Sequence, residues 1–127
     1  MTPRRATLAD AATLARLNTH VQAWHAAHYP EAFFPNPDPK ALAAHFADRL
    51  ADPACTGFLM GEPATGYALC QLHIREASIF SPGYRRLMID HIAVAPEARR
   101  QGQGLALLQA ARSLARHPSV VRFPRGH

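Results

Sequence analysis

The sequence has few residues of the kinds that mark secreted, membrane-bound or disulfide-stabilised proteins. Cys55 and Cys70 are the only cysteines among 127 residues, too few for a disulfide framework. Each lies in a stretch that reads as a strand, where a buried free thiol is the common state. No apolar run is long enough to span a bilayer, and residues 1–5 lack an apolar signal region. We therefore expect a cytoplasmic protein with reduced thiols and no membrane partner.

Lysine is almost absent as well, because Lys40 is the only one and arginine carries nearly all the positive charge. The 14 Lys and Arg residues outnumber the 9 Asp and Glu residues, and the net charge of +5 raises the question of nucleic-acid binding. The arginines are scattered apart from three pairs, and no stacking or helix-turn-helix pattern accompanies them. A polyanionic small molecule accounts for part of the surplus equally well. We expect no nucleic-acid partner, and one domain over residues 1–127.

A glycine-containing loop between an apolar run and a helical pattern is the most informative stretch. Residues 87–94 predict a strand, residues 95–104 a turn and loop, and residues 105–115 a helix. Gly102 and Gly104 let a bulky group approach the backbone, and the helix start offers free N–H groups and a positive dipole end. This combination predicts a phosphate or pyrophosphate cradle. The helix should bury one stripe, which we assign to Leu105, Leu107, Leu108, Ala111, Leu114 and Ala115.

The glycine spacing limits which nucleotide could bind. A dinucleotide fingerprint needs a third glycine where this chain has Leu107, and a Walker loop needs a lysine that is absent. The remaining alternative is a tight strand-to-helix turn whose glycines serve packing alone.

The pattern Q/R-x-x-G-x-G/A, filled here by Arg99, Gly102 and Gly104, resembles the acetyl-CoA motif of the GCN5-related N-acetyltransferases, the GNAT superfamily. Residues 92–97 resemble that family's usual run into the motif. The resemblance implies an α+β or α/β fold with a mixed, mostly antiparallel central sheet flanked by helices. It also implies acetyl-CoA as cofactor and direct transfer of an acetyl group to a primary amine of a small molecule or protein.

The rest of the chain follows the same order. We expect a short strand over residues 3–7, a helix capped at Thr7 and ended by Pro30, and an irregular proline-rich loop over residues 29–39. A second helix should begin at Pro39 and end before Pro53, followed by strands over residues 54–61 and 65–80.

The end of the chain departs from the family pattern. Residues 119–123 could form a fifth strand, but a typical GNAT domain carries one more helix and two more strands, which we expect to be missing. Because an unfinished sheet edge can pair with another chain, we expect a homodimer. The same departure supports an alternative, a catalytically weak or inactive domain that binds acyl-CoA or a partner.

The resemblance assigns the cofactor to a continuous set of positions. The strand end should hold the pantetheine arm, with an amide near Val94 facing the thioester carbonyl, and the loop and helix start should hold the pyrophosphate. The residues are Ile92, Ala93, Val94, Arg99, Arg100, Gln101, Gly102, Gln103, Gly104, Leu105 and Ala106.

The candidate base is Asp90, which lies nine residues before Arg99, as a carboxylate does in the histone-acetylating branch of the family. An apolar strand favours the neutral form of a carboxyl group, which suits a base near neutral pH. A structural hydrogen bond or a solvent-facing position is the equal alternative. His91 ranks lower, because neighbours in a strand face opposite ways unless a bulge intervenes. The nearby phenols are Tyr67 and Tyr84, and Tyr84 is a weak candidate for the acid.

The aromatic loop after the first helix lies where the family builds its acceptor pocket. By resemblance we assign to that pocket Trp24, His28, Tyr29, Glu31, Phe33 and Phe34. The spacing of His25 and His28 places both on one helix face, but no tight Cys or His pair completes a ligand set, so we expect no metal.

Overall fold

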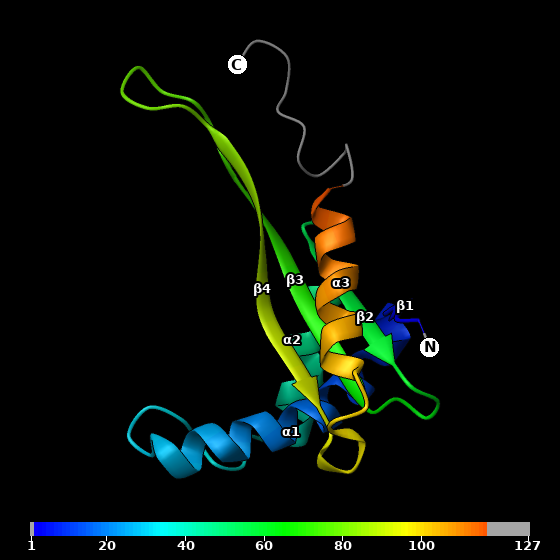
Figure 1. Cartoon of the computed structure of the whole chain (residues 1–127). Helices are drawn as coiled ribbons and strands as arrows, with labels where there is room; N and C mark the ends of the chain where they lie inside the picture. The colour runs from blue at the N-terminus through cyan, green and yellow to red at the C-terminus, as the bar shows by residue number, and fades with distance from the viewer. Residues whose placement is uncertain (1, 117–127) are drawn as a thin grey trace.

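The computed structural model describes residues 2–116, which form one four-stranded sheet and three α-helices (Figure 1). The elements in chain order are β1 (Arg4–Arg5), α1 (Ala11–His28), α2 (Pro39–Ala51), β2 (Cys55–Met60), β3 (Gly66–Arg75), β4 (Tyr84–Val94) and α3 (Gln103–Ala115). The strands lie in the order β1-β2-β3-β4, and every neighbouring pair is antiparallel. This confirms the predicted α+β fold with a mostly antiparallel sheet flanked by helices, and all strand pairs within residues 2–116 are antiparallel. The expected strand at residues 119–123 lies outside the described residues.

The prolines mark the end of α1 and the start of α2, as predicted. The other two starts differ, because α1 begins at Ala11 after a 3-10 turn at Leu8–Asp10, and α3 begins at Gln103, two residues before its predicted start. α1 ends at His28, two residues before Pro30, and α2 begins at Pro39. The Asp38 carboxylate caps α2 by accepting the Ala41 N–H at 2.9 Å. None of the helices within residues 2–116 combines the length and apolar character needed to cross a membrane.

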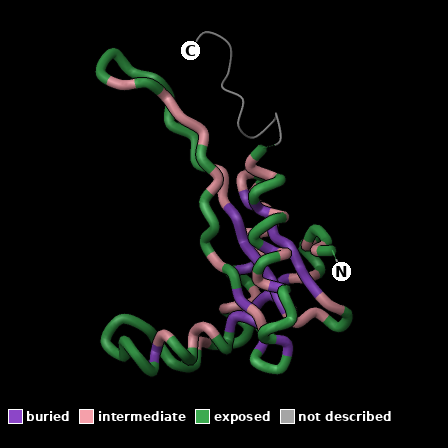
Figure 2. The backbone as a smooth tube through the Cα atoms, in the orientation of Figure 1, coloured by how far each residue is buried: buried purple, intermediate pink, exposed green. Residues whose placement is uncertain are grey.

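The sheet separates two apolar layers because successive side chains of a strand point to opposite faces. Leu59, Tyr67 and Leu69 pack with Leu14, Leu17 and Phe46 of α1 and α2. Their neighbours in the strands, including Phe58, Ala68 and Cys70, pack with Leu107 and Ala111 of α3 on the other face. Most of the buried chain lies in this region, where strands and helices overlap (Figure 2).

The buried face of α3 differs from the predicted one. Gln103, Leu107 and Ala111 are buried at a spacing of four residues, whereas Leu105 is 60% exposed and Leu108 39% exposed. Residues 105–108 are four consecutive apolar residues that occupy every side of the helix. Periodicity therefore could not choose the face, and packing against β2, β3 and β4 decides it.

The β3–β4 hairpin forms a long arm that leaves the body of the molecule (Figures 1 and 2). The predicted strand over residues 65–80 was too long, because β3 ends at Arg75 and a turn around Ser78 follows. The Ser78 hydroxyl accepts the N–H groups of Phe80 and Ser81, both at 3.1 Å. Ile79 and Phe80 at the arm tip are 94% and 90% exposed. β4 accordingly begins at Tyr84, earlier than the apolar run that predicted it.

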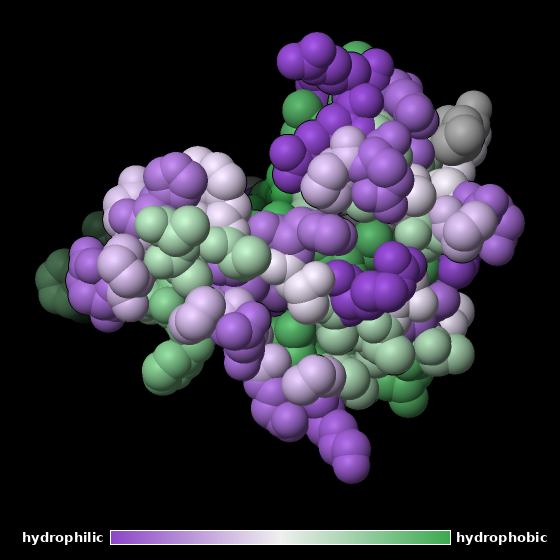
Figure 3. All heavy atoms as spheres, turned by 90° about the horizontal axis from the view of Figure 1, so that it is seen from below, coloured by the Kyte–Doolittle hydropathy of each residue, from purple (hydrophilic) through white to green (hydrophobic). Residues whose placement is uncertain are grey.

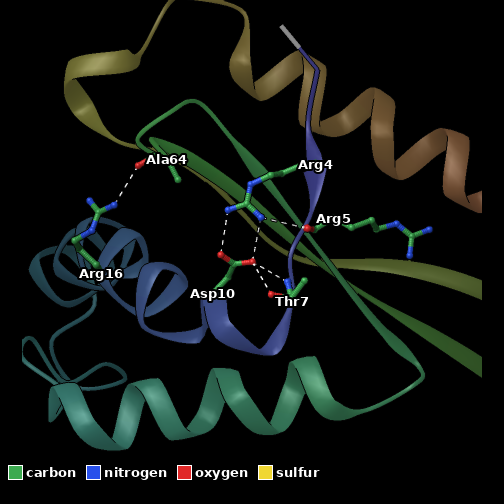
Figure 4. A network of polar contacts seen from close by, with 6 residues as sticks. All are labelled: Arg4, Arg5, Thr7, Asp10, Arg16 and Ala64. Atoms are coloured by element: carbon green, nitrogen blue, oxygen red, sulfur yellow. Dashed lines mark hydrogen bonds and ion pairs between the residues drawn. The ribbon is translucent and has the colours of Figure 1, made fainter.

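A polar network holds β1 against the start of α1 (Figure 4). The Arg4 guanidinium contacts the Asp10 carboxylate through two hydrogen bonds of 3.0 and 3.1 Å, and the Thr7 N–H donates to the same carboxylate at 2.7 Å. The bonds from Arg4 and Thr7 lower the pKa of Asp10 from 3.8 to about 2. Arg16 of α1 adds a hydrogen bond of 3.1 Å to the Ala64 carbonyl beyond β2.

This network predicts a pH-dependent contribution to stability. Because the folded state lowers the pKa of Asp10, the contribution is present above about pH 4 and disappears as the pH falls towards 2. Asp10→Asn should therefore lower the free energy of unfolding by about 1 kcal/mol at pH 7, since solvent screens the half-exposed Arg4. Urea denaturation at pH 7 and pH 2.5 measures the difference. The control is Asp48→Asn, at an exposed position of α2. A loss that stays constant down to pH 2.5 would contradict the prediction.

Candidate functional site

The start of α3 forms a backbone cradle. Gly102 precedes the helix with a φ of 79°, and the first intrahelical bond runs from the Ala106 N–H to the Gly102 carbonyl at 3.0 Å. The N–H groups of Gln103, Gly104 and Leu105 come before this bond and have no acceptor in the helix. Three donors at the positive end of the helix dipole therefore point the same way, while the predicted donor at Ala106 is used within the helix.

Space beside the two motif glycines shows that internal packing does not require them. A Cβ atom at either Gly102 or Gly104 would meet no atom within 4 Å. The left-handed backbone explains the glycine at 102. At 104 no such reason exists, and alanine would favour the helix by about 0.5–1 kcal/mol. The packing alternative fails at Gly104, whose lack of a side chain keeps an open approach to the helix start.

The side chains around the cradle divide into one anchor and two exposed cations. Gln103 is buried, and its Oε1 accepts the Thr65 hydroxyl at 2.9 Å, which ties the start of α3 to the turn before β3. Arg99 and Arg100 are exposed, and Arg99 reaches back to the Val94 carbonyl with a long contact of 3.4 Å. The backbone of Arg100 itself adopts the left-handed conformation, with a φ of 67°.

A cavity of about 540 Å³ lies on the opposite side of the sheet, between α1, α2 and the end of β4. Four of its lining residues were predicted as site residues, namely Phe33, Asp90, His91 and Ile92, and Tyr67 was considered as a phenol near the site. The remaining lining residues were not predicted as site residues, and they are Asn18, Val21, Gln22, His25, Leu42, His45 and Phe46. They come from two helices and reach the cavity only through tertiary packing.

A bulge brings Asp90 and His91 to the same cavity. Cys70 pairs with Ile89 and Leu69 pairs with His91, so Asp90 is an extra residue in β4. The expectation that only one of the two neighbours faces the cavity is therefore wrong, because the bulge interrupts the alternation. The Asp90 carboxylate lies 3.0 Å from the Arg49 guanidinium, which also donates to the Gln71 side chain at 2.7 Å.

His91 belongs to a buried hydrogen-bonded chain. The Asn18 amide donates to the Tyr67 hydroxyl oxygen at 3.0 Å, and that oxygen lies 3.0 Å from His91 Nδ1. Burial lowers the pKa of His91 and raises the pKa of Tyr67 to about 12. At neutral pH the imidazole is neutral and the phenol keeps its proton, so His91 can accept a proton.

The other predicted pocket residues do not gather in this cavity. Trp24 stacks on His28 with 4.0 Å between the ring centroids, and it lines a separate cavity of about 560 Å³. Tyr29, Glu31 and Phe34 are exposed on the lobe formed by the end of α1 and the following loop, where apolar and polar side chains alternate (Figure 3).

Tyr84 is also distant from the cavity. It pairs with Arg75 at the far end of β4, about 20 Å along the strand from Asp90. The Arg86 guanidinium lies over the Tyr84 ring, with its Cζ atom 4.1 Å from the ring centroid. Tyr67 is thus the phenol that reaches the cavity. Within residues 2–116, no three His, Cys, Asp or Glu side chains are grouped to bind a metal ion.

Comparisons with known proteins place this geometry in context. Residues 18–123 match the model of the acetyltransferase (GNAT) family. A protein from Arthrobacter sp. FB24 described as an acetyltransferase is 33% identical, with a TM-score of 0.66 over 91% of this chain and 67% of its own. A tetramutant of the BH1408 protein from Bacillus halodurans shares the fold at a TM-score of 0.81 and 21% identity, over 94% of this chain and 78% of its own.

A third solved structure, of a protein from Clostridium acetobutylicum described as an acetyltransferase, contains acetyl-CoA. It is 17% identical, with a TM-score of 0.67 over 94% of this chain and 75% of its own. No curated protein sequence matches the chain.

Proposed function

Because this chain belongs to the acetyltransferase (GNAT) family, we propose that it transfers an acetyl group from acetyl-CoA directly to a primary amine of a small molecule or protein. The observation that carries the proposal is the open backbone at Gly104, where the start of α3 leaves room for a ligand beside three N–H donors. An anionic diphosphate suits such a site, since both the donors and the helix dipole favour negative charge.

The chain offers two adjoining surfaces for acetyl-CoA, which supplies the activated acetyl group. The N–H groups of Gln103, Gly104 and Leu105 hold the pyrophosphate, and Arg99 and Arg100 add positive charge at the rim. The edge of β4 at residues 92–94 holds the pantetheine arm through backbone hydrogen bonds. This edge suits the role because, among the strands of residues 2–116, β4 pairs with β3 alone.

The acceptor amine occupies the cavity that contains Asp90 and His91. Ile92 supports this placement, because it lines the cavity and belongs to the β4 segment that we assign to the pantetheine arm. The two binding surfaces therefore meet at the end of one strand. Either Asp90 or His91 can take the proton that the amine must lose before it attacks the thioester.

The state of the two cysteines supports direct transfer. Cys55 and Cys70 are buried free thiols, and burial raises the pKa of both, that of Cys70 to about 11. A nucleophilic cysteine needs a thiolate. Neither cysteine lines the cavity, so the acetyl group has no cysteine carrier there.

Substitution at Gly104 tests the cradle. Gly104→Val should fold, since open space surrounds the position, but its side chain should obstruct the donors. Losing one hydrogen bond to a charged phosphate weakens acetyl-CoA binding roughly tenfold or more. Isothermal titration calorimetry measures the affinity, with Gly104→Ala as the milder control. Unchanged affinity in a folded Gly104→Val variant would contradict this assignment.

Steady-state kinetics tests the transfer itself. Release of free thiol from acetyl-CoA should depend on an amine acceptor, and double-reciprocal plots at several amine concentrations should intersect. Parallel lines would indicate a covalent acetyl-enzyme and contradict direct transfer. Binding of acetyl-CoA without thiol release across a broad amine panel would favour the alternative of an inactive acyl-CoA-binding domain.

We also propose that the protein forms a homodimer in the cytoplasm. The exposed Ile79 and Phe80 of the arm and Leu105 of α3 are apolar surfaces that a second copy could cover. Light scattering at high protein concentration should give the mass of two chains, and replacing Ile79 and Phe80 with serine should reduce it. A stable monomer at all concentrations would contradict the dimer.

A further inference from the structure

Asp90 and His91 compete for the role of base, and their surroundings differ. The Asp90 carboxylate is engaged with Arg49 at 3.0 Å, and its side chain is 30% exposed. Protonation of Asp90 would give up that ion pair. His91 is more deeply packed, with the ring of Phe46 edge-on at 5.8 Å between centroids, and no carboxylate within residues 2–116 forms an ion pair with it.

The position of His91 is fixed by two side chains that are themselves buried. Tyr67 is fully buried and Asn18 nearly so. The hydrogen bond from the Asn18 amide uses one lone pair of the Tyr67 oxygen. The second lone pair is available to His91, whose Nδ1 lies 3.0 Å from the same oxygen. Two arrangements satisfy this contact. Either Tyr67 donates its proton to Nδ1, or Nδ1–H donates to the free lone pair of Tyr67 and the phenol proton turns towards the cavity that Tyr67 lines.

We propose that His91 is the catalytic base and that Tyr67, held by Asn18, positions it with Nδ1–H donated to the phenol oxygen and Nε2 free to accept a proton. This inference rests on the proposed acetyl transfer. An imidazolium ion carries protons on both nitrogens, so its Nδ1–H must donate to Tyr67. The arrangement with Nδ1–H therefore serves both the neutral and the charged ring, and no hydrogen bond has to reverse when the proton arrives.

The proton balance is simple. The ammonium form of the acceptor gives one proton to Nε2, and the freed electron pair forms the C–N bond. The C–S bond breaks, and its electrons leave with the sulfur. Of the two protons that the nitrogen loses in total, one passes through His91 to solvent. The other ends on the leaving thiol.

The charged and titratable groups around His91 come from four elements. His25 of α1 and His45 and Arg49 of α2 disfavour the imidazolium, as does burial, which is the largest cause of the lowered pKa of His91. Asp90 of β4 opposes them, and Tyr67 of β3 provides the hydrogen-bond acceptor. If this acceptor stabilises the imidazolium, its removal must lower the pKa of His91 further.

Nitrogen NMR of the free protein tests the arrangement without any catalysis. His91 signals are assigned by their loss in His91→Gln. The neutral ring should carry its proton on Nδ1, and Tyr67→Phe should lower the pKa of His91 by about one pH unit, the value of one hydrogen bond to a charged group. Asn18→Ala should shift it in the same direction by less. A neutral ring with its proton on Nε2, or an unchanged pKa in both variants, would overturn the proposal.

Kinetics provides the second readout. The acidic limb of kcat/KM should move to lower pH in Tyr67→Phe by the same amount as the NMR titration, while His91→Gln should lower kcat roughly 100-fold. The control is His73→Gln, on the arm and outside the cavity. An acidic limb that disappears in Asp90→Asn but persists in His91→Gln would overturn the proposal. If acetyl-CoA does not bind or no thiol is released, the proposed acetyl transfer is wrong. The NMR experiment does not depend on catalysis, so it tests the hydrogen bond between His91 and Tyr67 separately.

Discussion

The arrangement of the cavity depends on one irregularity in the pairing of β3 with β4. With Asp90 as the extra residue, His91 rather than its neighbour lies opposite Leu69, on the face that α1 and α2 cover. Regular pairing would send either Asp90 or His91 to the α3 side. The bulge keeps both at the cavity, where Arg49 binds one and Tyr67 the other.

The two faces of the sheet carry different candidate binding surfaces, and both surfaces adjoin the end of β4. On one face, α3 packs through Leu107 and Ala111 and presents its open start beyond the sheet. On the other, α1 and α2 enclose a space lined by both polar and apolar side chains. The backbone passes directly from the cavity wall at Ile92 to the loop before Gly102. A ligand held at the start of α3 and a second ligand in the cavity would therefore meet along a single short segment.

Local signals in the sequence predicted the elements and the cradle, whereas long-range packing determined the cavity. The end of α1 before Pro30, the start of α2 at Pro39 and the loop leading to α3 follow from residues close together in the chain, and the structure confirms them. The run of residues 105–108 left the buried face of α3 undetermined. Asn18, Tyr67 and His91 are far apart in sequence, and no spacing rule connects them. The roles assigned to Asp90, His91 and the cofactor residues stay predictions.

Because of the long arm, the two halves of β4 differ in packing and in local stability. Near Tyr84 it belongs to a two-stranded ribbon that contains no buried residue, and near Ala93, which is buried, it packs against the helices. Isolated ribbons are marginally stable in water, so fraying begins at the tip and stops where burial starts. Amide exchange along this strand should therefore form a gradient, with its slowest protons beside the cavity. Local opening of the outer half leaves the chemistry at the inner half undisturbed.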